Sequence, residues 1–274
     1  MDVNVRLDFA LKLSVIVMSS AILVGCGSVP RKPASSYSLQ RFITPEVASE
    51  PLKVAGQAGY ANMHKVILPT TQEGSPDFQC EGTLYCRVDE STFIRGDLTV
   101  ASGVAFNYNT QLNRIGATWQ FYGDYSDQAK AGNFSQALVI GYSRDKDEES
   151  TPEELGDVNN GFNSRLWHQS TSSLDIGWVG GYRLADDWLV YGGPFTIVHD
   201  IDNTVNVEKQ VDFEVIRLQN KYAFKGRQVG ANIALRYEVL DWLDFHLEFV
   251  SSRYRLNNVT NSDSQFNFMV GTRF

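Results

Sequence analysis

The feature that most limits the fold of this chain is an alternation of apolar and polar residues along eight segments. A period of two belongs to a β-strand with two unlike faces. Most segments run for about nine residues, the length that a tilted strand needs to cross a bilayer. Their apolar faces consist of Leu98, Val100, Val104, Phe106 and Tyr108; Ile115, Ala117, Trp119 and Phe121; Phe134, Leu138, Ile140 and Tyr142; Leu174, Ile176, Trp178 and Tyr182; Leu189, Tyr191, Phe195 and Ile197; Val229, Ala231, Ile233, Leu235 and Tyr237; Phe245, Leu247 and Phe249; and Phe266, Phe268, Val270 and Phe274.

The opposite faces distinguish a soluble sandwich from a membrane barrel. In a sandwich the apolar faces of two sheets meet, whereas in a membrane barrel they meet lipid and the polar faces fill the lumen. The apolar faces here are strongly aromatic, and aromatic residues also gather beside short turns, as in "YRLADDW" and "YEVLDW". Such clusters are typical of a membrane interface. We therefore predict an all-β, antiparallel transmembrane β-barrel. Its lumen face would carry Asp97, Asp175, Arg183, Arg236, Asp244, His246, Glu248 and Arg273.

The chain closes with "FNFMVGTRF", in which Phe266, Phe268, Val270 and Phe274 alternate with other residues. This ending resembles the C-terminal insertion signal of bacterial outer-membrane barrels. The resemblance implies recognition by the barrel assembly machinery. In architecture the chain resembles the small barrel group typified by the transmembrane domain of outer membrane protein A.

The N-terminus has the pattern of a secretory signal. An apolar run of about twelve residues begins at Leu13, which is too short for a membrane helix and has the length of a signal-peptide core. It ends in "LVGC", which resembles the lipobox of bacterial lipoproteins. The resemblance implies that Cys26 is lipidated by the lipoprotein processing machinery, and Gly27 after it implies sorting to the outer membrane.

The predicted organisation has four parts. Residues 1–25 form the signal peptide, 26–50 a Ser- and Pro-rich tether, 51–97 an N-terminal segment, and 98–274 a barrel of eight strands. An alternative of ten strands adds one strand at 52–60, "LKVAGQAGY", and one inside 143–173, around "NSRLWHQST".

Two cysteines besides Cys26 lie close together in "CEGTLYC", and an even remainder in an oxidising compartment predicts a disulfide between Cys80 and Cys86. Free thiols are the alternative to this disulfide. The eight-strand barrel would place it on the periplasmic side, and the ten-strand barrel would place it in an external loop.

Connection lengths predict the orientation, because such barrels have short periplasmic turns and longer external loops. The connections at 183–188 and 238–244 would be periplasmic. Those at 143–173, 198–228 and 252–265 would be long external loops. The net charge of −8, without a basic cluster, argues against a nucleic-acid partner.

The clearest polar group is Asp244, His246 and Glu248 on one strand, with Arg236 and Arg273 on its neighbours. It is interpreted as an interior network of ion pairs; a general-base pair or half of a metal site is the alternative. "WHQST", with His168 and Ser170, resembles the His-x-Ser of lipid A deacylases at those two residues alone.

Two acidic stretches, the run from Ser143 and "HDIDN" around His199, are interpreted as solvated loops. No metal or cofactor is expected from these residues.

The expected function is non-enzymatic. A lipid-anchored outer-membrane barrel would use long external loops for a structural or surface-interaction role, with outer-membrane lipid, lipopolysaccharide or a surface protein as partners. The alternatives are a narrow channel or carrier for a small solute and a lipid A-modifying enzyme.

Overall fold

A computed structural model describes residues 35–38, 41–66, 85–153, 163–211, 214–256 and 259–273. The signal peptide, Cys26, Cys80 and Phe274 lie outside these ranges, so the predictions made for them stay predictions. No helix in the described ranges is long and apolar enough to span a membrane.

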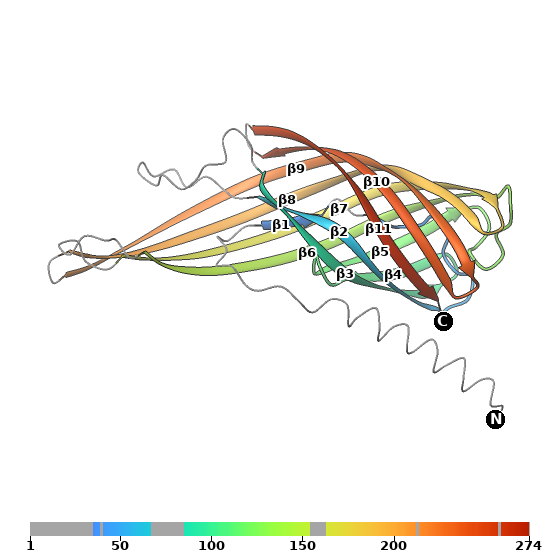
Figure 1. Cartoon of the computed structure of the whole chain (residues 1–274), viewed down its shortest axis with the longest axis horizontal. Coiled ribbons are helices and arrows are strands. Elements are labelled where there is room, and N and C mark those ends of the chain that lie inside the picture. The colour runs from blue at the N-terminus through green and yellow to red at the C-terminus, as the bar shows by residue number, and fades with distance from the viewer. Residues whose placement is uncertain are drawn as a thin grey trace, which may run out of the picture. The chain divides into compact units, whose positions relative to one another are not determined.

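The described strands form one antiparallel sheet that closes on itself (Figure 1). Closure follows because β2 pairs with β3 on one side and with β11 on the other. The strands are β1 (Ser35–Ser38), β2 (Val54–Val66), β3 (Tyr85–Ala101), β4 (Val104–Asn109), β5 (Arg114–Tyr122), β6 (Phe134–Glu153), β7 (Asn163–Ala185), β8 (Trp188–Val211), β9 (Glu214–Leu240), β10 (Leu243–Leu256) and β11 (Val259–Arg273).

Ten of these strands, β2 to β11, make the barrel in the described part of the chain, so the prediction of eight strands is wrong and the alternative of ten is confirmed. One added strand, β2, lies where the alternative placed it. The other is β3, not a strand inside 143–173. The barrel therefore begins at Val54, well before the predicted boundary at residue 98.

One predicted strand is two strands in the structure. The segment from Leu98 to Tyr108 is two strands joined by a tight turn at 102–103, with Gly103 at φ 73°. A register shift between Thr99 and Ala101 accompanies the turn, so that Thr99 pairs with Ala105 and Val100 keeps the same phase as Val104. Alternation alone does not reveal such a turn.

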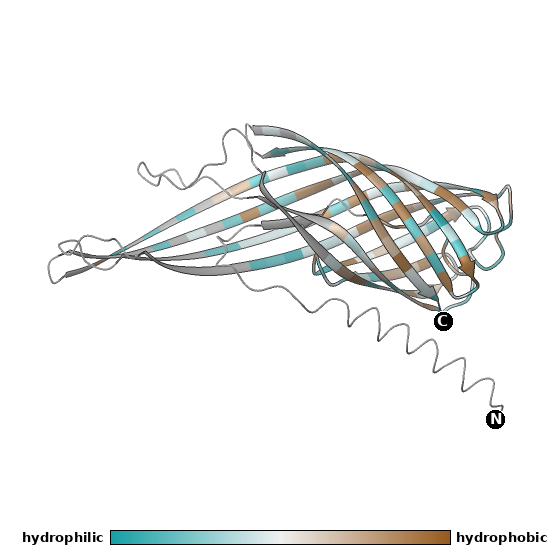
Figure 2. Ribbon diagram, in the orientation of Figure 1, coloured by the Kyte–Doolittle hydropathy of each residue, from teal (hydrophilic) through white to brown (hydrophobic). Residues whose placement is uncertain are grey.

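Most predicted apolar faces do point outward, where they form a hydrophobic band around the barrel wall (Figure 2). Strand β8 is the exception. Its side chains Leu189, Tyr191, Phe195 and Ile197, predicted to face lipid, are buried inside the barrel. Apolar material inside the lumen, described below, explains why they turn inward.

The two ends of the barrel differ. At the end that holds Arg273, connections of two residues (102–103, 186–187 and 241–242) and the longer 123–133 join the strands; we call this end the turn rim. At the other end, β6 to β9 continue together beyond the remaining strands (Figure 1). We call that end the projection rim.

The extension of β6 to β9 replaces predicted loops with strands. Pairing runs from Ser143↔Ser173 to Glu153↔Asn163 between β6 and β7, and from His199↔Gly226 to Val211↔Glu214 between β8 and β9. The segments 143–173 and 198–228 are thus largely paired β-structure, and most of 252–265 is too. We call the part of β6–β9 beyond Ser143 and Gly226 the projection.

The segment before β2 does not behave as the predicted tether. Strand β1 pairs with the projection-rim end of β2, from Ser35↔Val66 to Ser38↔Met63. Residues 41–50 then pass inside the barrel to the turn rim, where Leu52 donates its backbone N–H to the carbonyl of Thr99 (2.7 Å). We call residues 41–50 the plug.

Candidate functional site in the barrel lumen

The plug supplies apolar partners to the inside of the wall. Phe42 packs with Ala61, Phe93 and Met269, and its ring stacks on that of Phe93 at 5.8 Å between centroids. Ile43 packs with a second buried cluster that consists of Val139, Val179, Leu189, Tyr191 and Ala234. Strand β8 points Leu189 and Tyr191 inward because Ile43 gives them an apolar neighbour.

The backbone of the plug is held by a buried carboxylate. Glu248 accepts hydrogen bonds from the N–H groups of Arg41 (2.8 Å) and Phe42 (2.9 Å). It also accepts from the side-chain amides of Asn232 (2.7 Å) and Asn267 (3.1 Å). An extended segment with no sheet partner needs such acceptors, since a buried N–H left unpaired costs free energy.

A second anchor lies on the side of the plug nearer the projection rim. Asp175 pairs with Arg41 of the plug (3.0 Å) and with Arg114 of the wall (2.6 Å). The Arg41 guanidinium also lies 4.6 Å above the ring of Phe195. Arg95 donates to the plug carbonyl of Phe42 (3.0 Å).

A third anchor lies toward the turn rim. The buried Glu46 carboxylate pairs with Arg183 (2.8 Å), which in turn pairs with Glu238 (2.9 Å). The plug also packs closely on β7, because a Cβ added at Gly181 would lie 2.6 Å from Cγ of Pro45. Only glycine allows this approach.

The predicted polar group divides into two units. Asp244 pairs with Arg236 (2.9 Å) and Arg273 (3.1 Å) and bonds to Nε2 of His246 (2.9 Å), whose Nδ1 lies 2.9 Å from the Tyr191 hydroxyl. Glu248, two residues further on, instead holds the plug. All five predicted residues lie inside the barrel, and the bonds from Glu248 to the plug were not foreseen.

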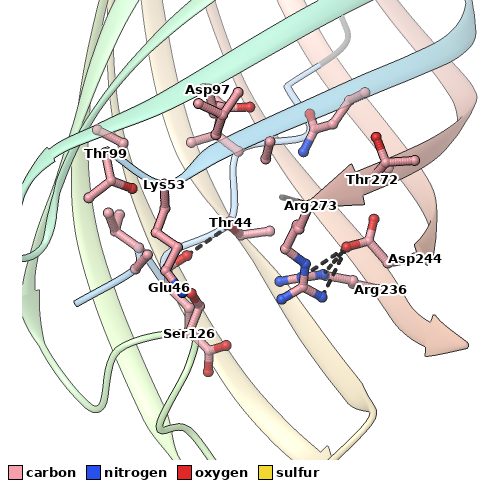
Figure 3. Close-up of a pocket in the computed structure, with 18 of the residues that line it drawn as sticks. Thr44, Glu46, Lys53, Asp97, Thr99, Ser126, Arg236, Asp244, Thr272 and Arg273 are labelled. Carbon is pink, nitrogen blue, oxygen red and sulfur yellow. Dashed lines mark hydrogen bonds and ion pairs between the residues drawn. The ribbon is translucent and has the colours of Figure 1, made fainter. Parts of the chain in front are cut away.

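A cavity of about 440 Å³ lies between the plug and the wall near the turn rim (Figure 3). Asp97, Thr272 and Arg273 line it from the wall, Thr44 and Glu46 from the plug, and Lys53 from the short link between the plug and β2. The end of the plug is fixed there by Asp127, which accepts a hydrogen bond from the N–H of Ser49 (3.0 Å). Slight burial opposes ionisation of Asp127, but hydrogen bonds from Ser49 outweigh it and lower the pKa of the carboxyl.

A separate cavity of about 50 Å³ lies on the other side of the plug, lined by Arg41, Arg114 and His199. The plug and its ion pairs separate the two cavities. The described lumen is therefore a packed interior, in agreement with what ion-paired side chains do in narrow barrels.

The remaining candidates are spread over the projection. His168 and Ser170 lie within β7, opposite Glu148 and Lys146 of β6, and not in a loop. His199 points inward and its Nδ1 lies 2.7 Å from the Ser173 hydroxyl, whereas Asp200 and Asp202 are exposed on the opposite face. Among the described residues no group of three or more metal-ligating side chains comes together.

Neither a protein-family model nor a curated protein sequence matches this chain. Similar solved structures include the outer membrane protease OmpT from Escherichia coli, with 12% identity and a TM-score of 0.36 over 82% of this chain and 94% of that one. Ail, the attachment invasion locus protein of Yersinia pestis, has 8% identity and a TM-score of 0.31 over 82% and 100%. The outer membrane channel DcaP of Acinetobacter baumannii has 9% identity and a TM-score of 0.22 over 82% and 96%. At these TM-scores the similarities assign no activity, and the barrel architecture follows from the strand pairing.

Proposed function

We propose that this protein is a plugged, non-conducting barrel of the bacterial outer membrane that presents the projection to a partner outside the cell. The outward hydrophobic band supports the membrane assignment. The short connections at the turn rim support a periplasmic position for that rim. A lipid anchor at Cys26 and contact with lipopolysaccharide belong to the same proposal.

The observation that carries the proposed function is that β6 and β9, the outer strands of the projection, each pair with a described strand on one side only. Pairing of β6 with β5 ends at Ser143↔Arg114, and pairing of β9 with β10 ends at Gly226↔Leu256. Beyond these points, no described strand other than β7 and β8 pairs with β6 or β9. A strand that pairs on one side only can accept a further strand, and peptide partners bind to sheet edges in this way.

The two edges carry opposite charge. Residues 144–153 of β6 contain Asp145, Asp147, Glu148, Glu149 and Glu153 against Arg144 and Lys146; residues 214–225 of β9 contain Arg217, Lys221 and Lys225 against Glu214. Charged edges resist indiscriminate aggregation and select partners of complementary charge. A partner with a complementary strand is therefore favoured over a small solute.

The plug argues against the channel alternative. A continuous path would have to displace Glu248, Asp175 and Arg183 from their buried plug partners together. The interior ion pairs likewise supply no free catalytic pair, because Asp244 and His246 are engaged with one another and with Arg236 and Tyr191.

Photo-crosslinking on intact cells tests the proposed function. A photoreactive amino acid would replace Lys146 on the β6 edge or Gln219 on the β9 edge, with Asp202 on the inner strand β8 as the matched control. All three positions are exposed on the projection. We expect covalent adducts from one or both edge positions and far fewer from position 202. Equal yields at all three positions, or none at either edge, would contradict binding by strand addition.

A further inference from the structure

The outer face of the barrel wall carries three arginines close to the projection rim. Arg227 lies on β9, Arg253 and Arg255 lie on β10, and all three side chains are exposed. We call them the arginine patch. We propose that the arginine patch binds the phosphate groups of an acylated lipid of the outer leaflet, the lipid A part of lipopolysaccharide. This inference rests on the proposed function, which places the projection rim outside the cell, and it gives the proposed contact with lipopolysaccharide a definite site.

The register of the sheet brings the three guanidinium groups together. Arg255 lies directly opposite Arg227 in the pairing of β10 with β9, and side chains in that position have Cβ atoms about 4.5–5.5 Å apart. Arg253 is two residues away along β10, on the same face and at a distance of about 7 Å. Like charges directly opposite one another are destabilising. A bound anion would relieve this repulsion.

A hollow of about 470 Å³ lies in the wall at the arginine patch. Val229, which pairs with Arg253, and Thr260, which pairs with Arg255, complete its lining. The Arg253 guanidinium has no ion-pair or hydrogen-bond partner among the residues that the structure describes. Guanidinium groups form forked, charge-assisted hydrogen bonds to phosphate. The hollow therefore offers such donors from two neighbouring strands to one phosphate group.

The level of the arginine patch along the wall fits the boundary between acyl chains and headgroups. On β9, Ile233 (57% exposed) and Val229 (48%) belong to the outward hydrophobic band, and Arg227 is the next outward residue. On β10, Leu247 belongs to the band and Arg253 lies beyond it, toward the projection rim. Charged side chains on the lipid face are costly near the bilayer midplane but not near its interface. An acylated lipid at this place would contact apolar residues with its chains and arginines with its phosphates.

The charges around the arginine patch also favour an anion. Lys225, the next outward residue of β9, adds a fourth positive charge. Its acidic neighbour Asp200 lies 3.8 Å from it on β8, so that β9 separates Asp200 from β10. The residues of β11 that pair with the patch, Thr260 and Ser262, are uncharged. This part of the outer face is therefore positive, although the whole chain has a net charge of −8.

Binding of lipid A to the purified full-length protein in a neutral detergent tests the site. Arg253→Gln removes one exposed charge and breaks no pair between described residues. Lys130→Gln is the matched control, because it removes one exposed charge from the turn-rim connection 123–133. A second variant, Arg227→Gln/Arg255→Gln, removes the opposed pair. Each variant is first checked for folding by its gel shift between unheated and heated samples.

We expect Arg253→Gln to weaken the binding of lipid A about tenfold, Arg227→Gln/Arg255→Gln to weaken it further, and Lys130→Gln to leave it unchanged. Lipid A without its phosphates should bind weakly and equally to all variants. Equal binding of lipid A by the unaltered protein and both arginine variants would overturn the inference. Inorganic pyrophosphate or phosphatidylglycerol that binds as tightly as lipid A would overturn it too, because the patch would then not select a phosphorylated glycolipid.

Photo-crosslinking from positions 146 and 219 keeps this result separate from the proposed function. Weaker lipid A binding by the arginine variants, without crosslinks from either edge of the projection, would support the arginine patch and contradict the proposed partner. Crosslinks from the edges, together with equal lipid A binding by all variants, would overturn the arginine patch alone.

Discussion

Strands β8 and β10 show the same alternation in the sequence but use their faces in opposite ways. Strand β10 points Asp244, His246 and Glu248 inward and leaves Leu247 57% exposed on the outside. Strand β8 points Leu189 (0% exposed) and Tyr191 (2%) inward. An alternating pattern therefore shows that the two faces of a strand differ, but the residues around the strand decide which face meets lipid.

The surroundings that differ are the residues of the plug. Beside β8 the plug offers the apolar Ile43, and beside β10 it offers backbone N–H groups to Glu248. Each strand directs inward the side chains that match its section of the plug. The barrel wall and the plug thus form one core, in contrast to an empty lumen lined uniformly with charge.

Removing the plug should have the largest effect on stability, because β8 and β10 then lose the residues that distinguish their inner faces. Replacing residues 41–48 with a Gly/Ser linker of equal length removes Arg41 from Asp175, Glu46 from Arg183 and Ile43 from Leu189. Removing one partner of a buried ion pair costs up to about 3–5 kcal/mol. We expect a large fall in the free energy of unfolding, measured by denaturant titration in vesicles.

The same variant should conduct ions in planar bilayers, in contrast to the intact chain. The intact protein is the control for both readings. Unchanged stability together with the absence of conductance steps would show that the wall closes the lumen by itself.

One substitution made on the two faces sharpens the comparison. Leu189→Ala leaves a cavity against Ile43 and should lower the free energy of unfolding by about 3–5 kcal/mol. Leu247→Ala, on the exposed face of β10, loses only transfer into lipid, about 1.5–2.5 kcal/mol. Vesicle unfolding of both variants measures the difference, and an equal cost would place Leu189 against lipid.

The next largest effect on stability is expected for the polar group of Asp244 and His246 on β10. His246→Ala leaves Asp244 Oδ1 and the Tyr191 hydroxyl without this partner, and we expect a loss of about 1–3 kcal/mol in the free energy of unfolding. Surface crosslinking from position 219 should stay unchanged. Loss of the crosslinks at unchanged stability would instead give His246 a functional role.

Two glycines on β7 offer a matched pair with a smaller effect. A Cβ at Gly181 would lie 2.6 Å from Pro45 of the plug, whereas at Gly177 the nearest atom is Cβ of Phe195 at 3.4 Å. We expect Gly181→Ala to cost about 1–3 kcal/mol and Gly177→Ala to change the free energy of unfolding by less than about 1 kcal/mol. The reverse order would mean that the plug does not pack on β7 at this point.

The sequence predicts the antiparallel barrel wall because side chains that face lipid have to be apolar. Ile140, Trp178 and Phe268 are such residues, and their side chains are exposed on the outer face. Strand β3 escaped prediction because Thr92 and Gly96 flank Ile94 on its outer face, so that face forms no continuous apolar row.

The plug could not be predicted for a different reason. Residues 41–50, "RFITPEVASE", form no regular element, so no periodicity marks them. Several of them are held by individual partners far along the chain, such as Glu248 for Phe42 and Arg183 for Glu46. The signal available in the sequence was a pair of apolar residues, Phe42 and Ile43, inside a segment otherwise suited to a linker.

Substitutions of charged residues in the projection should change the free energy of unfolding least, because these charges lie in water and not against the plug. Lys225 on β9 lies 3.8 Å from Asp200 on β8, and the two side chains are 87% and 58% exposed. Such a pair contributes little because water and salt screen it. We therefore expect Lys225→Gln to change the free energy of unfolding by less than about 0.5 kcal/mol, measured in the same vesicle assay.

The substitution should still weaken crosslinking from position 219, because it removes one of the basic charges of that edge. A stability loss as large as that of His246→Ala would mean that the projection is part of the packed core, and the distinction between a rigid plugged wall and a solvated projection would fail.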